Sequence, residues 1–144
     1  MIDSIDRMIL RELQRDGRQS NRELADKVGL SANATGVRLK RLFEDGYVVG
    51  VHARLNQPAL GRPIEAIVEL RLVSGVHPDQ VVEFFRSDQR VIEAWHITGR
   101  TDYLVRVAAE STKDLHDLLQ EMGTRRGLVT DIVTSLVLER IWAQ

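Results

Sequence analysis

The stretch from Arg18 to Gly50 constrains the fold more than any other part of the chain. Two short helices around a tight turn are predicted here, because a helix-start signal is followed by apolar residues at helical spacing and then by a glycine. Ser20 and Glu23 are spaced as a capping box, in which both side chains accept from N–H groups at the start of a helix. Gly29 offers the left-handed backbone conformation that ends such a helix and begins a sharp turn. The pattern indicates a helix-turn-helix.

The helix that follows the turn has an apolar face and a basic face. Ser31 is a suitable N-cap for this helix. Thr35, Leu39 and Leu42 fall at i, i+4 and i+7, which is the spacing of an inward face. In DNA complexes, exposed lysines and arginines commonly contact phosphates. The outer face is therefore predicted to reach phosphates through Arg38, Lys40 and Arg41.

A short strand is predicted directly after this helix. Gly46 ends the helix, and the run that begins Tyr47-Val48-Val49 is rich in residues that favour extended backbone. Two helices around a turn, followed by a strand, are typical of a winged helix-turn-helix, which places its second helix in the major groove of DNA. The residues predicted to contact double-stranded DNA are Ser31, Asn33, Gly36, Val37, Arg38, Lys40 and Arg41.

Two of these residues have an equally simple alternative role. Asn33 is the best candidate for a contact with a base edge, but an exposed asparagine near a helix start also serves as a cap or is solvated. Arg38 either holds a phosphate or forms an internal salt bridge with Glu44 or Asp45. Sequence pattern leaves both alternatives open.

A third helix is predicted ahead of the helix-turn-helix. Asp3 or Ser4 caps it, and regularly spaced isoleucine and leucine residues share one of its faces. The three helices and the strand make a winged helix-turn-helix DNA-binding domain over residues 1–55. A linker with two prolines and a glycine follows over residues 56–63, and a second domain occupies residues 64–144.

The second half of the chain changes to an alternating pattern. Residues 64–73 alternate apolar and charged side chains, which predicts a half-buried strand. The elements that follow give the order β-α-β-β-α-β of the ferredoxin-like fold, so the whole chain is predicted to be an α+β protein. These elements are a helix over 79–87, strands over 91–98 and 103–109, a second helix, and a long strand from Val129 to Trp142. Ser111 and Asp114 are predicted to cap the second helix, and residues 123–127 to end it.

An antiparallel sheet with helices on one face leaves its other face open. Alternate residues of the strands, among them Ile67, Val73, Leu104 and Ala108, give this second face apolar character. Large exposed apolar patches mark interaction surfaces. A second copy of the domain is the simplest cover, so we expect a homodimer formed through this half of the chain.

Charge is distributed unevenly between the two halves. The whole chain has a net charge of −1, with 20 Lys and Arg against 21 Asp and Glu. Residues 1–56 carry 10 basic and 8 acidic residues, a net +2, whereas residues 57–144 carry 10 and 13, a net −3. Affinity for DNA grows with the number of cations that reach phosphates. A monomer is therefore expected to bind weakly, and an oligomer is expected to add several basic faces together.

The composition argues against several other classes. With no cysteine, the chain forms neither a disulfide framework nor a thiolate metal site. Its four histidines lack the spacing of metal ligands, so neither a metal nor another cofactor is expected. No apolar run approaches the roughly 20 residues that span a bilayer, and the acidic N-terminus is unlike a signal peptide. No membrane association and a cytoplasmic location are expected.

The chain resembles the Lrp/AsnC family of bacterial and archaeal regulators, the feast/famine proteins, over nearly its whole length. In the first half, the resemblance lies in Asp3-x-x-Asp6-Arg7-x-Ile9-Leu10-x-x-Leu13-Gln14, Arg18-x-Ser20-x-x-Glu23-Leu24-Ala25, Val28-Gly29-Leu30-Ser31, Arg38-Leu39-Lys40-Arg41-Leu42 and Gly46. In the second half, it lies in Val91-x-Glu93-Ala94, Thr98-Gly99-x-x-Asp102-Tyr103-Leu104 and Thr134 ahead of Val137-Leu138. Two positions depart from the pattern: Thr35 stands where a larger aliphatic residue is common, and Gly36 lies inside a helix, which costs about 1 kcal/mol relative to alanine.

The resemblance implies a mechanism. Members of the family dimerise through the βαββαβ domain, often assemble into octamers that bend or wrap DNA, and in many cases bind a free amino acid between dimers. By this resemblance, Gly99 offers backbone groups to the effector, Arg100 faces its carboxylate and Asp102 accepts from its ammonium. The effector-binding residues implied are Thr98, Gly99, Arg100, Asp102 and Thr134. The implied function is a sequence-specific transcriptional regulator that responds to an amino acid, rather than an enzyme.

Other functions are also compatible with this sequence. A nucleoid-organising protein would bind DNA with little sequence preference and no effector. Proteins resembling sirohaem decarboxylases share the two-domain architecture, and His96 and Arg100 would then grip a tetrapyrrole. RNA recognition is disfavoured, because aromatic residues that would stack on bases are missing from the appropriate strands. Asp102 has an alternative role as the cap of a turn.

Overall fold

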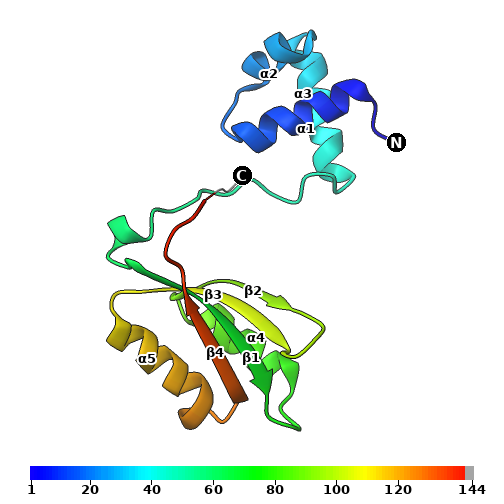
Figure 1. The fold of residues 1–144 in the computed structure, drawn as a ribbon. Helices are drawn as coiled ribbons and strands as arrows, with labels where there is room; N and C mark the ends of the chain where they lie inside the picture. Colours follow the sequence, from blue (N-terminus) through cyan, green and yellow to red (C-terminus); the bar gives the residue numbers. More distant parts are fainter. Residues whose placement is uncertain (142–144) are drawn as a thin grey trace. The chain divides into compact units, whose positions relative to one another are not determined.

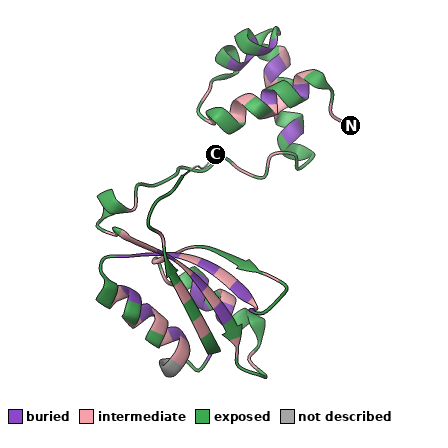
Figure 2. Cartoon of the chain, viewed as in Figure 1, coloured by how far each residue is buried: buried purple, intermediate pink, exposed green. Residues whose placement is uncertain are grey.

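The computed structural model describes residues 1–141, apart from the side chains of residues 124 and 125. Within that part, the chain forms two compact units, residues 1–54 and residues 55–141 (Figure 1). Each unit has its own apolar core, and the buried residues concentrate inside the units (Figure 2).

Three helices make up the first unit, and each begins after a residue predicted to cap it. The helices are α1 (Ser4–Arg15), α2 (Asn21–Val28) and α3 (Ala32–Glu44). The side chains of Asp3, Ser20 and Ser31 each accept a hydrogen bond from an N–H group in the first turn of the helix that follows. Ser20 and Glu23 form the predicted capping box, and Gly29 ends α2 in the left-handed conformation, with φ 71°.

The core of the first unit forms where the three helices meet. Ile9 of α1, Leu24 of α2 and Leu42 of α3 are fully buried. Thr35 is fully buried as well, as its inward spacing predicts, but its Oγ1 has no hydrogen-bond partner among the described residues. A buried hydroxyl without a partner lowers stability.

Gly36 lies against the side chain of a residue in α2. A Cβ at position 36 would lie 2.9 Å from Nδ2 of Asn21, in the first turn of α2. From sequence, a glycine inside this helix indicates either a close approach to DNA or a less stable helix. The contact with Asn21 is a further reason, and it depends on the packing of the two helices.

The strand predicted after α3 does not form within one chain. No strand is present between Tyr47 and Leu55 in the described structure. The N–H groups of Tyr47 and Val48 instead both donate to the carbonyl of Leu42, at 2.9 and 3.1 Å, and close the end of α3. A strand needs a neighbouring strand for its backbone hydrogen bonds, and the described part of this unit contains no other.

The second unit is a four-stranded antiparallel sheet with two helices on one face (Figure 1). The strand order β2-β3-β1-β4 and the order of elements confirm the predicted ferredoxin-like arrangement. Its elements are a 3₁₀ turn (Pro58–Leu60), β1 (Ile64–Leu72), α4 (Pro78–Ser87), β2 (Val91–His96), β3 (Tyr103–Ala109), α5 (Thr112–Gln120), a π-helical turn (Glu121–Arg125) and β4 (Val129–Leu136).

The core of this unit lies between the sheet and the two helices. Ala66, Val68 and Leu70 alternate along β1 and are fully buried. Phe84 of α4 and Leu118 of α5 pack in the same core. The period of two in the sequence therefore predicted the buried face correctly.

The opposite face of the sheet carries apolar residues among charged ones. Of the four residues predicted to make this face apolar, Ala108 is fully buried and Val73 lies beyond the end of β1. Trp95 and Val133 are 44% and 43% exposed. The strand register places Ile67, Trp95, Leu104 and Val133 together on this face.

The last strand ends earlier than predicted. β4 ends at Leu136 rather than at Trp142, and Trp142 itself lies outside the described residues. The N–H of Val137 still donates to the carbonyl of Glu65 at 2.8 Å. Because β1 begins at Ile64, β4 has no further residues to pair with beyond this point.

The helical segment that begins with α5 ends within residues 123–127, as predicted. A π-helical turn continues α5, and the chain leaves the helical conformation at Gly127, with φ 60°. Gly123 lies against β4: a Cβ there would be 3.6 Å from Ile132 and 3.9 Å from Val129.

Candidate DNA-binding and effector sites

The outer face of α3 carries Asn33, the side chain predicted to contact a base edge. Asn33, Val37 and Lys40 are exposed at i, i+4 and i+7, and Val37 is 63% exposed although it is apolar. An asparagine suits the major-groove edge of adenine, and a small apolar side chain suits the methyl group of thymine. Ser31 caps the helix, and Lys40 lies 3.6 Å from Glu44 in an exposed ion pair. The face combines an amide and an exposed apolar side chain with a cation.

Two other basic residues of α3 are bound to carboxylates of the α1 region. Nη1 of Arg38 donates to Oδ2 of Asp3 at 2.5 Å and to Oδ1 of Asp6 at 2.9 Å. Nη2 of Arg41 donates to Oδ2 of Asp6 at 2.6 Å. Asp6 is fully buried, whereas the side chains of Arg38 and Arg41 are 28% and 46% exposed. This four-residue cluster, the α1–α3 clasp, fixes the recognition helix against the start of α1.

The predicted partners of Arg38 were wrong. The arginine pairs with Asp3 and Asp6 rather than with Glu44 or Asp45. From the sequence, Asp3 is predicted to cap α1, and Asp6 is only one residue of the family motif. The spacing of two acidic residues within one turn does not identify a partner more than 30 residues away, so the clasp is visible only in the fold.

The clasp also determines the ionisation of its two carboxyls. Burial by itself opposes ionisation of Asp6, but the N–H of Asp3 and the Arg38 guanidinium outweigh it and hold the pKa of Asp6 below its ordinary value. The N–H of Asp6 and the same guanidinium lower the pKa of Asp3. Both groups are therefore ionised at neutral pH and offset the charge of the two arginines.

The predicted effector loop connects β2 to β3. Thr98, Gly99 and Arg100 are exposed in it, and Gly99 has a φ of 130°, which favours glycine. Arg71 of β1 donates from Nε to the carbonyl of Arg100 at 3.0 Å, and its Nη2 bonds the same oxygen. The loop is thus tied to the end of β1 through its backbone.

Asp102 has a structural role in this loop. Its Oδ2 accepts from the N–H of Leu72 at 2.7 Å, and its own N–H donates to the carbonyl of Leu70 at 2.8 Å. The alternative to ligand binding considered for this residue was a cap within the turn. The Asp102 carboxylate does accept from a backbone N–H, as a cap would, but this N–H belongs to β1 and not to the turn.

Thr134 lies away from this loop within one chain. It stands opposite Val68 in the β1–β4 register and therefore shares the helix-covered face of the sheet. β1 separates β4 from β3, and the loop joins β2 to β3. One chain does not bring Thr134 together with the other predicted effector residues.

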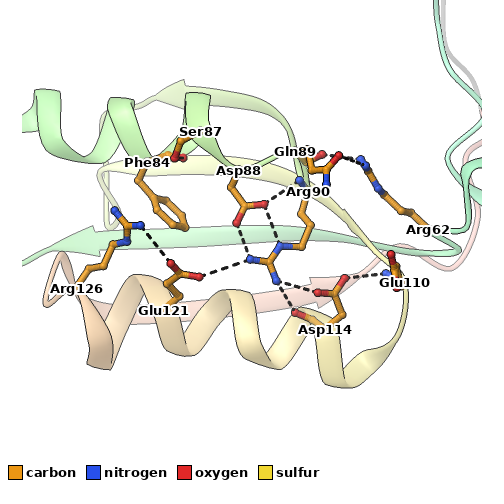
Figure 3. Close-up of a pocket in the computed structure, with 10 residues that line it drawn as sticks. All are labelled: Arg62, Phe84, Ser87, Asp88, Gln89, Arg90, Glu110, Asp114, Glu121 and Arg126. Carbon is orange, nitrogen blue, oxygen red and sulfur yellow. Dashed lines mark hydrogen bonds and ion pairs between the residues drawn. The ribbon is translucent and has the colours of Figure 1, made fainter.

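A polar pocket of about 410 Å³ between α4 and α5 was not predicted from the sequence (Figure 3). Arg90 lies at its centre: Nε and Nη2 donate to Asp88 at 2.9 and 2.5 Å, and Nη1 donates to Asp114 at 2.8 Å. Glu121 lies 3.7 Å from Arg90 and pairs with Arg126 at 3.2 Å. Because these charged groups satisfy one another, the pocket is a structural cluster that joins the start of β2 to α5.

Arg90 also changes how α5 begins. Ser111 accepts from the N–H of Asp114 at 3.1 Å, as predicted, but the Asp114 carboxylate turns to the N–H of Glu110 and to Arg90. The predicted capping box is therefore only half formed. Hydrogen bonds with Asp88 and Asp114 raise the pKa of Arg90, and the bonds from Arg90 lower the pKa of Asp88.

The histidine considered for a tetrapyrrole site is packed against an aromatic ring. His96 stacks on Tyr103, with ring centres 4.9 Å apart and planes 20° apart, and Tyr103 is buried. In residues 1–141, no group of three or more His, Asp or Glu side chains is placed to hold a metal ion. No helix in the same residues is long and apolar enough to cross a membrane.

A helix-turn-helix unit with an exposed recognition helix, joined to a ferredoxin-like unit, defines a two-domain DNA-binding regulator. Residues 2–49 match the family model described as winged helix-turn-helix DNA-binding. Residues 65–144 match the model described as the Lrp/AsnC ligand binding domain. The chain belongs to the Lrp/AsnC family of transcriptional regulators.

Relatives are similar over nearly their full length. The leucine-responsive regulatory protein of Escherichia coli (strain K12) is 36% identical over 143 residues, which cover 97% of this chain and 87% of that protein. A transcriptional regulator from Neisseria meningitidis in complex with L-methionine has a TM-score of 0.89 and 27% identity, covering 99% of this chain and 94% of that one. A feast or famine regulatory protein from Mycobacterium tuberculosis, complexed with L-methionine, has a TM-score of 0.89 and 31% identity, covering 99% and 96%. These similar proteins are regulators, and this chain is a DNA-binding transcriptional regulator of the Lrp/AsnC type.

Proposed function

We propose that α3 reads a DNA sequence in the major groove. Asn33 contacts an adenine edge and Val37 a thymine methyl group, because both lie exposed on one face of the helix. Ser31 and Lys40 contact phosphates at the two ends of that face. Gly36 lies against a side chain of α2 and leaves room for the DNA backbone.

Arg38 and Arg41 have different roles in this proposal. Arg41 is nearly half exposed and makes one hydrogen bond, to Asp6, so its other N–H groups reach a phosphate. Arg38 is less exposed and bonds two carboxylates, so it orients the recognition helix from inside. The α1–α3 clasp is the observation that supports this division.

The second unit forms a homodimer through the open face of its sheet. Trp95 and Val133 are more than two-fifths exposed there, with Ile67 and Leu104 beside them. A second copy covers this apolar surface and places two recognition helices on one DNA duplex. Further association of dimers, up to an octamer, brings additional recognition helices to the DNA, and the protein acts in the cytoplasm, where the DNA is.

A free amino acid modulates this assembly. Two similar regulators have been solved with L-methionine bound. In this chain, the exposed residues Thr98, Gly99 and Arg100 offer backbone and cationic groups to a carboxylate, and Asp102 faces the ammonium. Because Thr134 lies at the other edge of the sheet, it completes the site only from another chain.

The DNA-binding proposal is tested with labelled duplex from the upstream region of the gene. We expect tighter binding to this duplex than to a scrambled one, with affinity that falls steeply with salt. Fluorescence anisotropy at two salt concentrations measures both properties. Asn33→Ala is expected to lose the preference for the native duplex, with Gln80→Ala on α4 as the control. Equal binding to both duplexes by the unmodified protein would favour a nucleoid-organising role.

The effector proposal is tested with a screen of free amino acids. Light scattering and anisotropy are expected to show that one of them changes the mass or the DNA affinity of the protein. Arg100→Ala is expected to weaken this response and to leave DNA binding in its absence unchanged, because the Arg100 carbonyl, not its side chain, holds the loop. Unchanged mass and affinity with every amino acid at saturation would contradict the proposal.

A further inference from the structure

The recognition helix supplies little net positive charge. The two carboxylates of the α1–α3 clasp offset Arg38 and Arg41, and Glu44 lies beside Lys40. Association with DNA depends on cations that displace the counterions of phosphates. The unneutralised cations of the first unit must therefore lie elsewhere on its surface.

A basic groove of about 750 Å³ runs along α1 in the first unit. It lies between that helix and the extended segment of residues 47–54. Apolar side chains such as Leu10 and Val48 form its floor. Its cations are Arg7, Arg11, Arg15 and Arg54, and the described residues that line it include no aspartate or glutamate.

The arginines of the groove are largely free of internal partners. Arg7, Arg11 and Arg54 are exposed, and none makes an ion pair with a residue that the structure describes. Arg15 pairs with Glu12 at 2.9 Å but is 71% exposed. These groups therefore keep their charge available to an anion, in contrast to Arg38 of the recognition helix, which bonds two carboxylates.

The packing of the first unit holds these cations in one row. Arg7, Arg11 and Arg15 follow one another at i, i+4 and i+8, so they share one face of α1 at intervals of about 6 Å along its axis. The extended segment lies against Gly17 at the end of α1, where a Cβ would lie 2.5 Å from Cγ1 of Val51. This segment forms the second wall of the groove, which carries Arg54.

We propose that this groove is a second DNA-contact surface, which binds the sugar–phosphate backbone of duplex DNA. The inference rests on the proposed DNA binding and adds a site that α3 does not provide. A regular row of arginines suits repeated phosphates, and apolar side chains between them suit the deoxyribose edge. Backbone contacts carry no direct sequence information, so the groove contributes affinity and not sequence preference.

The test compares the salt dependence of binding to a mixed-sequence duplex of about six helical turns. Arg7→Ala/Arg11→Ala is expected to reduce the slope of log affinity against log salt by about 0.9 for each arginine. Arg7→Lys/Arg11→Lys keeps the charge and is expected to keep most of the slope. Arg86→Ala on α4 is the matched control, because Arg86 is also an exposed helical arginine.

Circular dichroism and light scattering check that the variants keep their fold and mass. An unchanged slope for the double alanine variant would overturn the inference and would favour an acidic peptide as the ligand of the groove. A changed slope that follows a changed mass would overturn it too, because the groove would then be an interface between copies. If the unmodified protein binds no duplex, both this inference and the proposed function fail; if it binds and only the variant result is negative, the proposed function stands.

Discussion

At the scale of single residues, Thr35 is the position least suited to its surroundings. It is fully buried on the inward face of α3, yet its hydroxyl oxygen has no partner among the described residues. The family resemblance anticipates a larger aliphatic residue here. A hydroxyl that gives up water on folding without gaining a partner costs about 1–3 kcal/mol. Threonine therefore fits the space at this position, but its hydroxyl lacks the hydrogen bond that a buried polar group needs.

Thr35→Val is expected to stabilise the chain. Valine keeps the shape of threonine and removes the unsatisfied hydroxyl, so the free energy of unfolding should rise by about 1 kcal/mol. Urea unfolding followed by circular dichroism measures the change. Thr35→Ser is the control: it keeps the hydroxyl and leaves a cavity, and it should lower stability. A lower stability for the valine variant would indicate that the hydroxyl does have a partner in solution.

At the scale of elements, charged clusters join helices that apolar packing alone would leave less precisely oriented. In the first unit, the clasp ties α3 to the start of α1 through Asp6, which is fully buried. In the second unit, Arg90 ties the start of β2 to α5. Arg90 uses its fork to bond two carboxylates at once, which fixes direction as well as distance, whereas in the clasp Nη1 of Arg38 alone bonds both Asp3 and Asp6.

Asp6→Asn is expected to destabilise the first unit by about 2 kcal/mol, because two arginines lose a charged partner. The pKa of Asp6 is lowered in the folded chain, so its carboxylate contributes stability above the ordinary pKa of about 3.9 and loses it as the pH falls through the lower folded value. The difference in unfolding free energy between the two proteins should therefore shrink below about pH 4. Urea unfolding at several pH values measures it, and a difference independent of pH would contradict the role of charge.

Arg90→Lys is expected to destabilise the second unit although it keeps the charge. A lysine has one nitrogen and cannot bond both oxygens of Asp88 while it reaches Asp114. The expected loss is about 2 kcal/mol in thermal or urea unfolding. Arg86→Lys, on the exposed side of α4, should change stability little. Equal effects of the two substitutions would mean that the fork geometry of Arg90 is unimportant.

At the scale of the whole molecule, the surfaces most relevant to assembly are those that remain exposed in a single chain. The sheet exposes Trp95 and Val133 on its uncovered face, and β1 lies between Thr134 and the loop of residues 98–102. For these two reasons, we expect the working form to contain more than one copy. A regulator that combines several weakly charged DNA-binding units also gains affinity from their number.

Ile67→Asp is expected to separate the copies. The register places Ile67 in the middle of the open sheet face, and a carboxylate there would be buried in a dimer interface without a partner. Light scattering should show the mass of a single chain, and DNA affinity should fall because two recognition helices no longer act together. Gln80→Asp adds the same charge to α4 and should leave the mass unchanged. An intact dimer in the Ile67 variant would place the interface elsewhere.

Local chemistry made much of this molecule predictable. The caps Asp3, Ser20 and Ser31, the turn at Gly29 and the alternation along β1 all lie in short stretches of sequence, and the structure has them as predicted. Helix starts depend on side chains within one turn, and buried faces depend on periodicity, so neither requires knowledge of distant residues. The order of elements then determined the fold class.

The tertiary structure decided what depends on contacts between distant residues. Arg38 pairs with Asp3 and Asp6 rather than with Glu44 or Asp45 on its own helix and just after it. The Asp114 carboxylate bonds Arg90 and the N–H of Glu110, so it does not complete the predicted capping box. The predicted wing strand did not form, because a strand exists only with a partner. Sequence by itself therefore determined most of the elements and the class of regulator, but not the wing strand or the end of β4. Only the fold determined which charges remain free for DNA, because ion pairing depends on which side chains the packing brings together.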